Sequence, residues 1–491
     1  MRFSFEKKDF IEQNIESNKV AIIGDDFELT WVEFEKKVNE LCDYLVANNL
    51  TNLKYPVMIY GHKSANMLVA IYAMMKLEIT YIPIDLIYPN ERISKILELA
   101  KCELIINTTN QKIVGNDVTE LLLFNADYSF INLLPNYTKS DRINDPLVYT
   151  IFTSGSTGEP KGVQISTEAI QSFVRWMTSD FGFTSTDVFI NTAILSFDLS
   201  VFEVMTFSAL GATLVLNNKD YNSDPKLLLP RIQKNKGTVW VSTPSFALMY
   251  SRMGSVIELN SVKTFLFCGE VLPHGIAKNL VANFNNAKVI NTYGPTEATV
   301  ATTLVIIDQT ILDKYDPLPV GRSKPESELL IDDDEIVIVG PNVSIGYLNN
   351  PELNKAKFIL VDGQRAFKTG DKGYLENGML FFHGRNDDLV KLHGYRIELS
   401  EITTTLNNLS YVLHGETIAL KREGIVKKIV SLVQLDSNLL EPIDVVKVKA
   451  DLAKTLPIYM VPADIKFIEK IPLNQNGKAD KQLLTKIYLG E

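Results

Sequence analysis

A chain of 491 residues is too long for a single hydrophobic core, so two or more domains are expected. Its apolar share of 46% and charged share of 22% are typical of a soluble globular protein, and no run of about 18 apolar residues predicts a membrane-spanning helix. The net charge of −10 argues against nucleic acid as the main partner, and three cysteines without a C-x-x-C pair indicate neither a disulfide framework nor a zinc site.

The first residues, 1–9, contain no apolar core of a signal peptide, so we expect a cytoplasmic protein without membrane insertion. The apolar run 57–61, the helical pattern 65–76 and the apolar run 80–85 then give strand–helix–strand order, which is typical of a parallel sheet. Similar apolar runs recur at residues 104–107, 212–216, 238–242 and 264–268. The sequence therefore predicts an α/β fold whose large N-terminal domain consists of parallel-rich αβ layers.

Shorter strands separated by turns replace this pattern in residues 330–385. The runs 335–340 and 380–384 are two of them, and each is only five or six residues long. Such a change of pattern predicts a small barrel-like β part at the end of the large domain.

The last hundred residues predict a small α+β domain. Strands 417–420 and 428–433 are expected to form a hairpin, and residues 444–456 have the periodicity of an amphipathic helix. A polar stretch precedes this part of the chain, and we expect the domain boundary to lie in it. The expected domains are residues 1–386 and 387–491.

A strand that leads into a glycine-rich loop is the most informative pattern in the sequence. Residues 152–163 read Phe-Thr-Ser-Gly-Ser-Thr-Gly-Glu-Pro-Lys-Gly-Val and follow the apolar run 146–151. Backbone N–H groups, hydroxyls and one ammonium can surround a chain of phosphates there, and glycine allows a close approach of the backbone. The spacing fits neither the G-x-x-x-x-G-K-[ST] loop nor the dinucleotide fingerprint. A flexible linker is the alternative, and the apolar residues on both sides argue against it.

This loop resembles the phosphate-binding signature of the adenylate-forming superfamily, which comprises acyl-CoA synthetases, luciferases and the adenylation domains of peptide synthetases. The resemblance implies that the chain binds ATP and that the loop contacts the phosphates. The loop residues it assigns to ATP are Thr153, Ser154, Gly155, Ser156, Thr157, Gly158 and Lys161.

A second segment, residues 291–297, reads Asn-Thr-Tyr-Gly-Pro-Thr-Glu and is expected at a strand end, where ligands bind in open α/β sheets. It resembles the Tyr-Gly-Pro-Thr-Glu motif of the same superfamily. The resemblance implies that Tyr293 stacks on adenine, Thr296 contacts phosphate and Glu297 binds Mg²⁺, which takes few carboxylates beside phosphate oxygens. The other nucleotide-binding residues it implies are Asn291, Thr292 and Gly294. A plain turn with a helix-capping Thr and Glu is the alternative.

Three further motifs lie near the domain boundary. Residues 368–371, Lys-Thr-Gly-Asp, resemble the Tyr-x-Thr-Gly-Asp motif, which implies that Asp371 accepts both ribose hydroxyls. Arg385 is implied to contact ribose or phosphate, and Asp387 matches the hinge between the two domains. Residues 390–398 resemble the hairpin that lines the thiol tunnel after the small domain rotates, so a mobile C-terminal domain is implied.

The Asn476-Gly477 pair is a strong tight-turn signal that would present Lys478 at its tip. A turn lysine is usually a solvated surface group. The match to the Asn-Gly-Lys motif of the superfamily implies instead that Lys478 is the catalytic lysine. Its ammonium would bridge the substrate carboxylate and the α-phosphate of ATP and stabilise the charge that develops there.

Specificity is expected to depend on the pocket for the acid. Residues 196–200, Ser-Phe-Asp-Leu-Ser, resemble the segment whose aspartate, here Asp198, pairs with the α-amino group of an amino acid. A helix N-cap is the alternative role for this residue. The other pocket positions implied are Leu199, Phe202, Ser245, Leu266, Cys268, Thr292, Val300 and Ala301. Most of them are small or apolar, which favours a small, uncharged side chain on the substrate.

Segments 241–246, 267–273 and 296–301 closely resemble the D-alanine–D-alanyl carrier protein ligases, whereas Phe202 and residues 203–207 differ from them. The resemblance implies a monomeric ligase that uses ATP and Mg²⁺ to form an aminoacyl-adenylate, with D-alanine as the preferred amino acid. The acyl group would pass to the phosphopantetheine thiol of a carrier protein supplied in trans.

Four alternatives stay open at this point. Within the same fold, the substrate could be L-proline, L-alanine, glycine or serine in a secondary pathway. An acyl-CoA synthetase is a second alternative, against which Asp198 argues. A luciferase-like oxidoreductase and a non-catalytic nucleotide-binding relative are the others, and Lys478, Glu297 and Asp371 argue against the last.

Overall fold

The chain forms two compact units. The computed structural model describes residues 18–25, 27–111, 113, 118–122, 147–155, 159–251, 259–385, 389–422, 425–436, 442–472 and 479–490. Unit 1 comprises residues 1–85, 99–151 and 162–386, and unit 2 comprises residues 86–98, 152–161 and 387–491. The domain boundaries and the mobility expected from the sequence stay predictions. Among the described helices, none combines the length and the apolar character needed to cross a bilayer.

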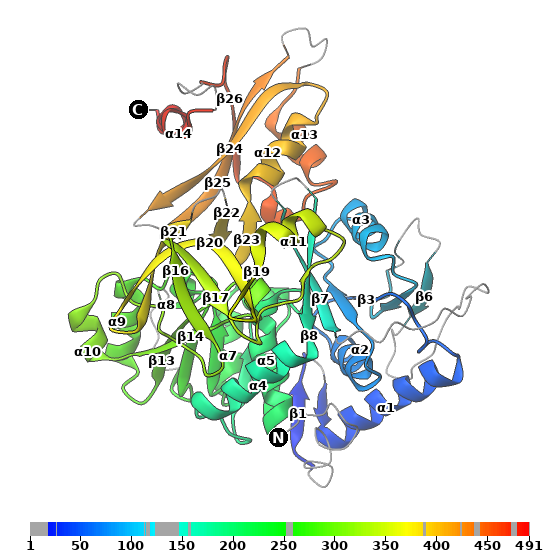
Figure 1. Ribbon diagram of the computed structural model, residues 1–491. Coiled ribbons are helices and arrows are strands. Elements are labelled where there is room, and N and C mark those ends of the chain that lie inside the picture. The colour runs from blue at the N-terminus through cyan, green and yellow to red at the C-terminus, as the bar shows by residue number, and fades with distance from the viewer. Residues whose placement is uncertain are drawn as a thin grey trace. The chain divides into compact units, whose positions relative to one another are not determined.

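A nine-stranded sheet forms one layer of unit 1, in the order β15-β14-β13-β12-β11-β9-β10-β1-β2. Figure 1 labels three of these strands, β14, β13 and β1. Its parallel centre consists of β13 (Lys288–Tyr293), β12 (Thr264–Phe267), β11 (Val239–Ser242), β9 (Val188–Asn191), β10 (Thr213–Leu216) and β1 (Val20–Ile23). The antiparallel edge strands are β14 (Thr303–Ile307), β15 (Arg322–Ser323) and β2 (Glu28–Thr30). Most residues of the central strands are buried, which explains their continuous apolar runs.

The second sheet has seven strands in the order β18-β8-β7-β4-β3-β5-β6. Its strands are β18 (Gly346–Tyr347), β8 (Lys161–Ser166), β7 (Leu147–Thr153), β4 (Tyr81–Ile84), β3 (Val57–Tyr60), β5 (Leu104–Asn107) and β6 (Thr119–Leu122). Helix α2 (Ala65–Lys76) connects β3 to β4, and these two strands pair in parallel. The predicted strand–helix–strand unit is therefore confirmed.

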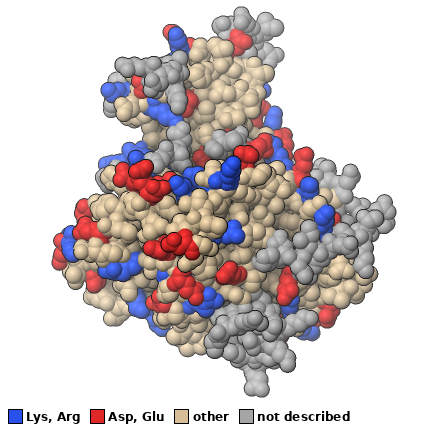
Figure 2. All heavy atoms as spheres, viewed as in Figure 1, with Lys and Arg blue, Asp and Glu red and all other residues tan. Residues whose placement is uncertain are grey.

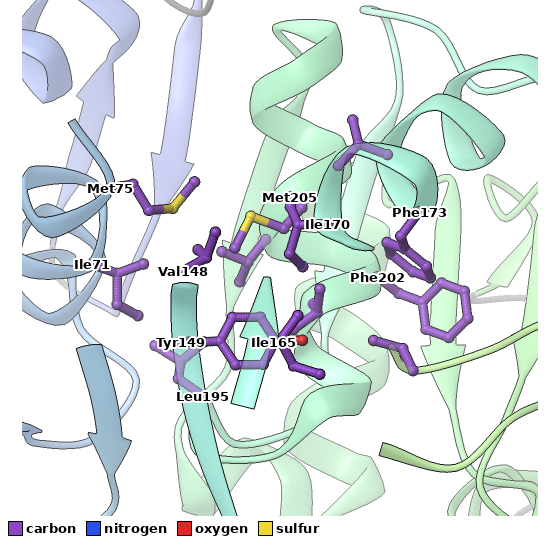
Figure 3. Packing of buried hydrophobic residues seen from close by; sticks show 14 of the residues in the cluster. Ile71, Met75, Val148, Tyr149, Ile165, Ile170, Phe173, Leu195, Phe202 and Met205 are labelled. Carbon is purple, nitrogen blue, oxygen red and sulfur yellow. The ribbon is translucent and has the colours of Figure 1, made fainter. Parts of the chain in front are cut away.

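Helices α2, α4 (Thr167–Asp180) and α5 (Val201–Leu210) build the core of unit 1 together with β7 and β8. Figure 3 shows side chains from these five elements meeting, among them Ile71, Tyr149, Phe173 and Phe202. Each of these four side chains is at most 3% exposed. The remaining helices of the unit are α1 (Trp31–Ala47), α6 (Lys219–Ser223), α7 (Pro225–Lys234), α8 (Pro244–Ser251), α9 (His274–Asn283), α10 (Gln309–Lys314) and α11 (Pro351–Lys357).

A third, curled sheet of unit 1 is antiparallel and has five strands. They are β16 (Glu328–Asp332), β17 (Glu335–Val339), β19 (Phe358–Val361), β20 (Gln364–Glu376) and β21 (Met379–Arg385). This sheet confirms the small barrel-like β part expected from residues 330–385. Together with the parallel-rich layers, it confirms the predicted fold class.

The C-terminal part of unit 2 is a small α+β structure, as the sequence predicts. Its elements are β22 (Leu389–Leu392), β23 (Tyr395–Glu398), α12 (Leu399–Asn407), β24 (Val412–Arg422), β25 (Ile425–Leu435), α13 (Val445–Leu452), β26 (Asp464–Phe467) and α14 (Lys481–Leu489). The expected hairpin is β24–β25. Helix α13 starts one residue later than predicted, since Asp444 is its N-cap, and ends four residues earlier.

On the face that Figure 2 shows, acidic and basic side chains are interspersed.

Candidate active site

Four neighbouring parallel strands of the nine-stranded sheet, β9, β11, β12 and β13, end at the same edge. The segments after β9, β11 and β12 carry Asp198, Ser245 and Cys268. Strand β13 itself carries Asn291, Thr292 and Tyr293 at its end. Residues far apart in sequence are thus gathered at the carboxyl edge of a parallel sheet, which is where ligands bind in such folds.

Close contacts join the small residues predicted to line the acid pocket. The Thr292 hydroxyl donates to the carbonyl of Phe267 at 2.8 Å, and the Cys268 Sγ lies 3.7 Å from the carbonyl oxygen of Val300. Leu266 and Ala301 are fully buried. Val300 has a φ of +68°, a conformation that β-branched residues rarely adopt and that is often found at functional sites.

The remaining pocket positions have different surroundings. Asp198 and Leu199 are half-buried in a 3₁₀ turn, η1 (Asp198–Ser200), and the Ser245 N–H donates to the carboxylate of Glu270 at 3.0 Å. Phe202 is fully buried and packs edge-to-face on Phe173 of α4, with ring centroids 5.2 Å apart. The bulky ring of Phe202 is therefore part of the hydrophobic core.

The capping role considered for Asp198 does not match the local structure. The N-cap of η1 is Phe197, the N-cap of α5 is Ser200, and neither makes a side-chain capping bond. Burial raises the pKa of Tyr149 well above its ordinary value, and the charges of Tyr81 and Asp198 add to this increase. The carboxylate of Asp198 thus lies near the buried Tyr149 ring.

Three predicted nucleotide-binding residues meet between two sheets of unit 1. The Tyr293 hydroxyl donates to Oδ2 of Asp371 at 2.5 Å, and the Arg385 guanidinium pairs with Oδ1 of the same carboxylate. Asp371 and Arg385 are direct partners in the β20–β21 ladder. Burial raises the pKa of Tyr293 well above its ordinary value, and the charge of Asp371 raises it further. Tyr293 is thus held as a neutral donor that orients Asp371.

Asn291 is only 1% exposed, and its two side-chain amide atoms differ in their hydrogen bonding. Nδ2 donates to the carbonyl of Pro319 at 2.9 Å, whereas Oδ1 has no hydrogen-bond partner among the described residues. A buried acceptor without a partner is unfavourable unless a ligand supplies the donor. The glycine at position 294 is required here, since a Cβ would lie 2.5 Å from the Cα of Ala301.

Glu297 is fully buried in a 3₁₀ turn, η3 (Thr296–Ala298). The N-cap of this turn is Pro295, so the capping alternative for Thr296 and Glu297 does not match the structure. Tyr347 donates its hydroxyl to Oε1 of Glu297 at 2.7 Å. The described residues contain no cluster of three or more metal-ligating side chains. A single carboxylate nevertheless fits Mg²⁺ that is also held by phosphate oxygens.

The described part of the glycine-rich loop belongs to unit 2, where the segment 396–401 contacts it. The Ser154 hydroxyl donates to the carbonyl of Arg396 at 2.8 Å and accepts from the N–H of Glu398 at 3.1 Å. Lys161 Nζ lies 3.5 Å from a carboxylate oxygen of Glu398. The Thr153 hydroxyl is buried without a partner among the described residues, which suits a loop that binds an anion.

Two residues of unit 2 that the sequence analysis did not single out hold this loop. Glu401 accepts from the N–H of Gly155 at 3.0 Å and pairs with the guanidinium of Arg92. Gly155 cannot be replaced here, since a Cβ would lie 2.0 Å from the carbonyl oxygen of Glu159. Arg92 and Glu401 are 309 positions apart, so no local pattern signals the pair.

Five predicted site residues lie outside the described residues: Ser156, Thr157, Gly158, Asp387 and Lys478. The roles of Ser156, Thr157 and Gly158 at the phosphates stay predictions. The same holds for the hinge role of Asp387 and for the catalytic role of Lys478.

The chain is similar to known proteins in sequence and in fold. The AMP-binding enzyme family matches residues 11–348. The D-alanine–D-alanyl carrier protein ligase of Bacillus cytotoxicus is 37% identical over 489 residues, which cover 96% of this chain and 97% of that protein.

Two solved structures are similar in fold. The Vibrio cholerae adenylation domain AlmE, in complex with glycyl-adenosine-5'-phosphate, has a TM-score of 0.84 and 22% identity and covers 100% of this chain and 99% of that one. The artificially fused adenylation–PCP di-domain NpsA-ThdA from Klebsiella oxytoca has a TM-score of 0.79 and 22% identity over 93% of each chain.

Proposed function

Because this chain belongs to the AMP-binding enzyme family and is an adenylate-forming ligase that uses ATP, we propose that it activates a small amino acid. D-Alanine is the proposed substrate. Its carboxylate attacks the α-phosphorus of ATP, pyrophosphate leaves, and a bound aminoacyl-adenylate results. The acyl group then passes to the phosphopantetheine thiol of a separate carrier protein, and AMP leaves.

The observation that carries this proposal is the composition of the carboxyl edge formed by β9, β11, β12 and β13. A half-buried carboxylate, Asp198, follows β9 at this edge, and the segments after β12 and β13 contribute small or apolar side chains, such as Cys268, Val300 and Ala301. A carboxylate suits the ammonium of an amino acid, and small apolar walls suit a methyl side chain. The similarity to the Bacillus cytotoxicus ligase supports D-alanine as the amino acid.

Polar and charged side chains with suitable donors and acceptors would bind the nucleotide. Asn291 Oδ1 can accept a hydrogen bond from the amino group of adenine, and Asp371 can accept both ribose hydroxyls. Thr153 and Lys161 offer a hydroxyl and an ammonium to phosphate oxygens. Glu297 would hold Mg²⁺, which neutralises charge on the phosphates when it is bound.

The remaining chemistry needs a charge partner for the attacking carboxylate. In this proposal Lys478 supplies it, because its ammonium can bind the substrate carboxylate and the α-phosphate together. Rotation of the C-terminal domain about Asp387 would then bring the thiol of the carrier protein to the adenylate.

ATP–pyrophosphate exchange with D-alanine, L-alanine, glycine, serine and L-proline tests the proposal. D-Alanine should give the fastest exchange, with measurable rates for the other small amino acids, since apolar pockets discriminate by only about 10- to 200-fold per methylene. If exchange is at least tenfold faster with L-proline or a bulky amino acid, that amino acid is the substrate and the assignment of D-alanine is wrong. Thioester formation on free coenzyme A from a carboxylic acid without an amino group would instead support an acyl-CoA synthetase.

A further inference from the structure

A buried lysine connects the two large sheets of unit 1 and has no part in the proposed chemistry. Lys63 lies between β3 and α2 and is 8% exposed. Its Nζ donates to the carbonyl oxygen of Thr192 at 2.7 Å. Strand β3 belongs to the seven-stranded sheet, whereas Thr192 is the first residue after β9 of the nine-stranded sheet. The contact therefore crosses from one sheet to the loop that carries Asp198.

The Thr192 peptide is held from several elements at once. Its N–H donates to Oε1 of Glu203 on α5 at 3.1 Å, and its hydroxyl donates to the carbonyl of Val241 on β11 at 2.5 Å. The amide of Asn222 on α6 donates to the same carbonyl oxygen as Lys63, at 2.7 Å. Thr192 is thus a fixed point at the start of the loop.

Local hydrogen bonds stabilise the loop between Thr192 and Asp198. The Asn191 amide donates to the carbonyl of Ala193 at 3.0 Å, and the N–H of Phe197 donates to the carbonyl of Ile194 at 3.0 Å. The Ser200 hydroxyl then donates to the carbonyl of Phe197 at 2.7 Å. Thr192 begins this loop and Asp198 lies near its end, so the bonds that hold Thr192 limit the positions open to Asp198.

We propose that Lys63 is a positioning residue for the amino-acid substrate: its ammonium fixes Thr192 and thereby the place of Asp198 relative to the seven-stranded sheet. This role rests on the proposed function only in so far as Asp198 binds the substrate ammonium. The contacts themselves are part of the fold.

The charges around Lys63 explain why a lysine suits this position. Burial lowers its pKa to about 7, against the opposing effect of the carboxylates of Glu203 and Asp85. Both acids are fully buried. Burial likewise raises the pKa of Glu203 to about 8. A neutral side chain at position 63 would leave the Asn222 amide as the remaining side-chain donor to the Thr192 carbonyl, and it would remove the cation next to Glu203 and Asp85, which is unfavourable.

The test compares Lys63→Met with Lys76→Met. Lys76 is a half-buried lysine at the end of α2, the helix that follows Lys63, and its ammonium binds Asn39 on α1, so the substitution is matched but does not touch the loop. Two quantities are measured: amide hydrogen exchange of residues 192–200, and the KM values for amino acid and ATP in pyrophosphate exchange. We expect Lys63→Met to speed amide exchange in this segment and to raise the amino-acid KM about 10- to 100-fold, with the KM for ATP within twofold. Lys76→Met should change neither.

A second variant keeps the test decisive if Lys63→Met does not fold. Lys63→Met combined with Glu203→Gln removes the lysine and one of its two neighbouring acids, while the other acid, Asp85, keeps its contact with His62 Nδ1 at 2.8 Å; buried sites tolerate this better than an unpaired charge. The Thr192 carbonyl still lacks its ammonium, so the same two changes are expected. Wild-type amide exchange in residues 192–200 of the folded variants would overturn the inference. Faster amide exchange in a protein whose wild type activates no amino acid would instead refute the proposed function and leave the structural role of Lys63 intact.

Discussion

The buried pair of Arg92 and Glu401 allows a quantitative prediction about unit 2. The two side chains are 3% and 1% exposed, and Glu401 also accepts from the N–H of Gly155. Two further donors of Arg92, Nε and Nη2, have no hydrogen-bond partner among the described residues. Burial of this ion pair therefore has a large desolvation cost, and the stability of the region depends on the presence of both partners.

Arg92→Met should lower the free energy of unfolding of unit 2 by about 3–5 kcal/mol, because it leaves the Glu401 carboxylate buried without its cation. Adding Glu401→Gln should restore stability to within about 1 kcal/mol of wild type, since the amide oxygen can still accept from Gly155 and no charge is left unpaired. Lys95→Met on α3 (Asn90–Ala100) is the matched control. Its pair with Glu159 is exposed and should contribute at most about 1 kcal/mol.

Native-state hydrogen exchange of residues 397–407 is the suitable assay, because it reports the opening of this region without requiring the whole chain to unfold in one step. A loss below 1 kcal/mol for Arg92→Met would refute the reasoning, since it would mean that water or another cation compensates Glu401. A double variant as unstable as the single one would refute it as well. The shape of the two side chains, rather than their charge, would then hold the region together.

The other predictions concern substrate, catalysis and pH. Asp198→Ala should reduce amino-acid-dependent exchange by at least about 100-fold with unchanged ATP binding, and equal loss of both would contradict an ammonium anchor. Lys478→Ala should slow adenylate formation about 100- to 1000-fold while ATP binds within a few-fold, and exchange near the wild-type rate would exclude the catalytic role. Hydrogen bonds from Lys454 and Tyr411 lower the pKa of Asp451 from 3.8 to about 2. This carboxylate thus stabilises the fold above pH 3.8, and the contribution disappears as the pH falls through 2. Asp451→Asn should lose about 1 kcal/mol at pH 7 in urea unfolding and only a small part of that at pH 2.

Much of the fold can be predicted from the sequence, because a parallel strand that is buried on both faces consists of a continuous run of apolar residues. The run 104–107 coincides with β5, the pattern 65–76 coincides with α2, and the runs 57–61 and 264–268 each extend one residue beyond β3 and β12. The sequence signal of the glycine-rich loop is local as well. Its backbone conformation restricts which residue types are possible within a few positions. Gly155 shows this, because a Cβ would collide with the carbonyl of Glu159 four residues on.

The tertiary structure alone decided which groups meet across long separations. Lys63 lies 129 positions from Thr192, Arg92 lies 309 positions from Glu401, and Tyr347 lies 50 positions from Glu297. Periodicity reports whether a residue is buried, but it carries no information about its partner on another element. Phe202 illustrates the difference: motif matching predicts that it lines the acid pocket, and only the tertiary structure shows that its ring packs on Phe173 of α4. Strand order and helix packing set such contacts, because a buried charge or ring is stable only where the whole fold supplies a partner.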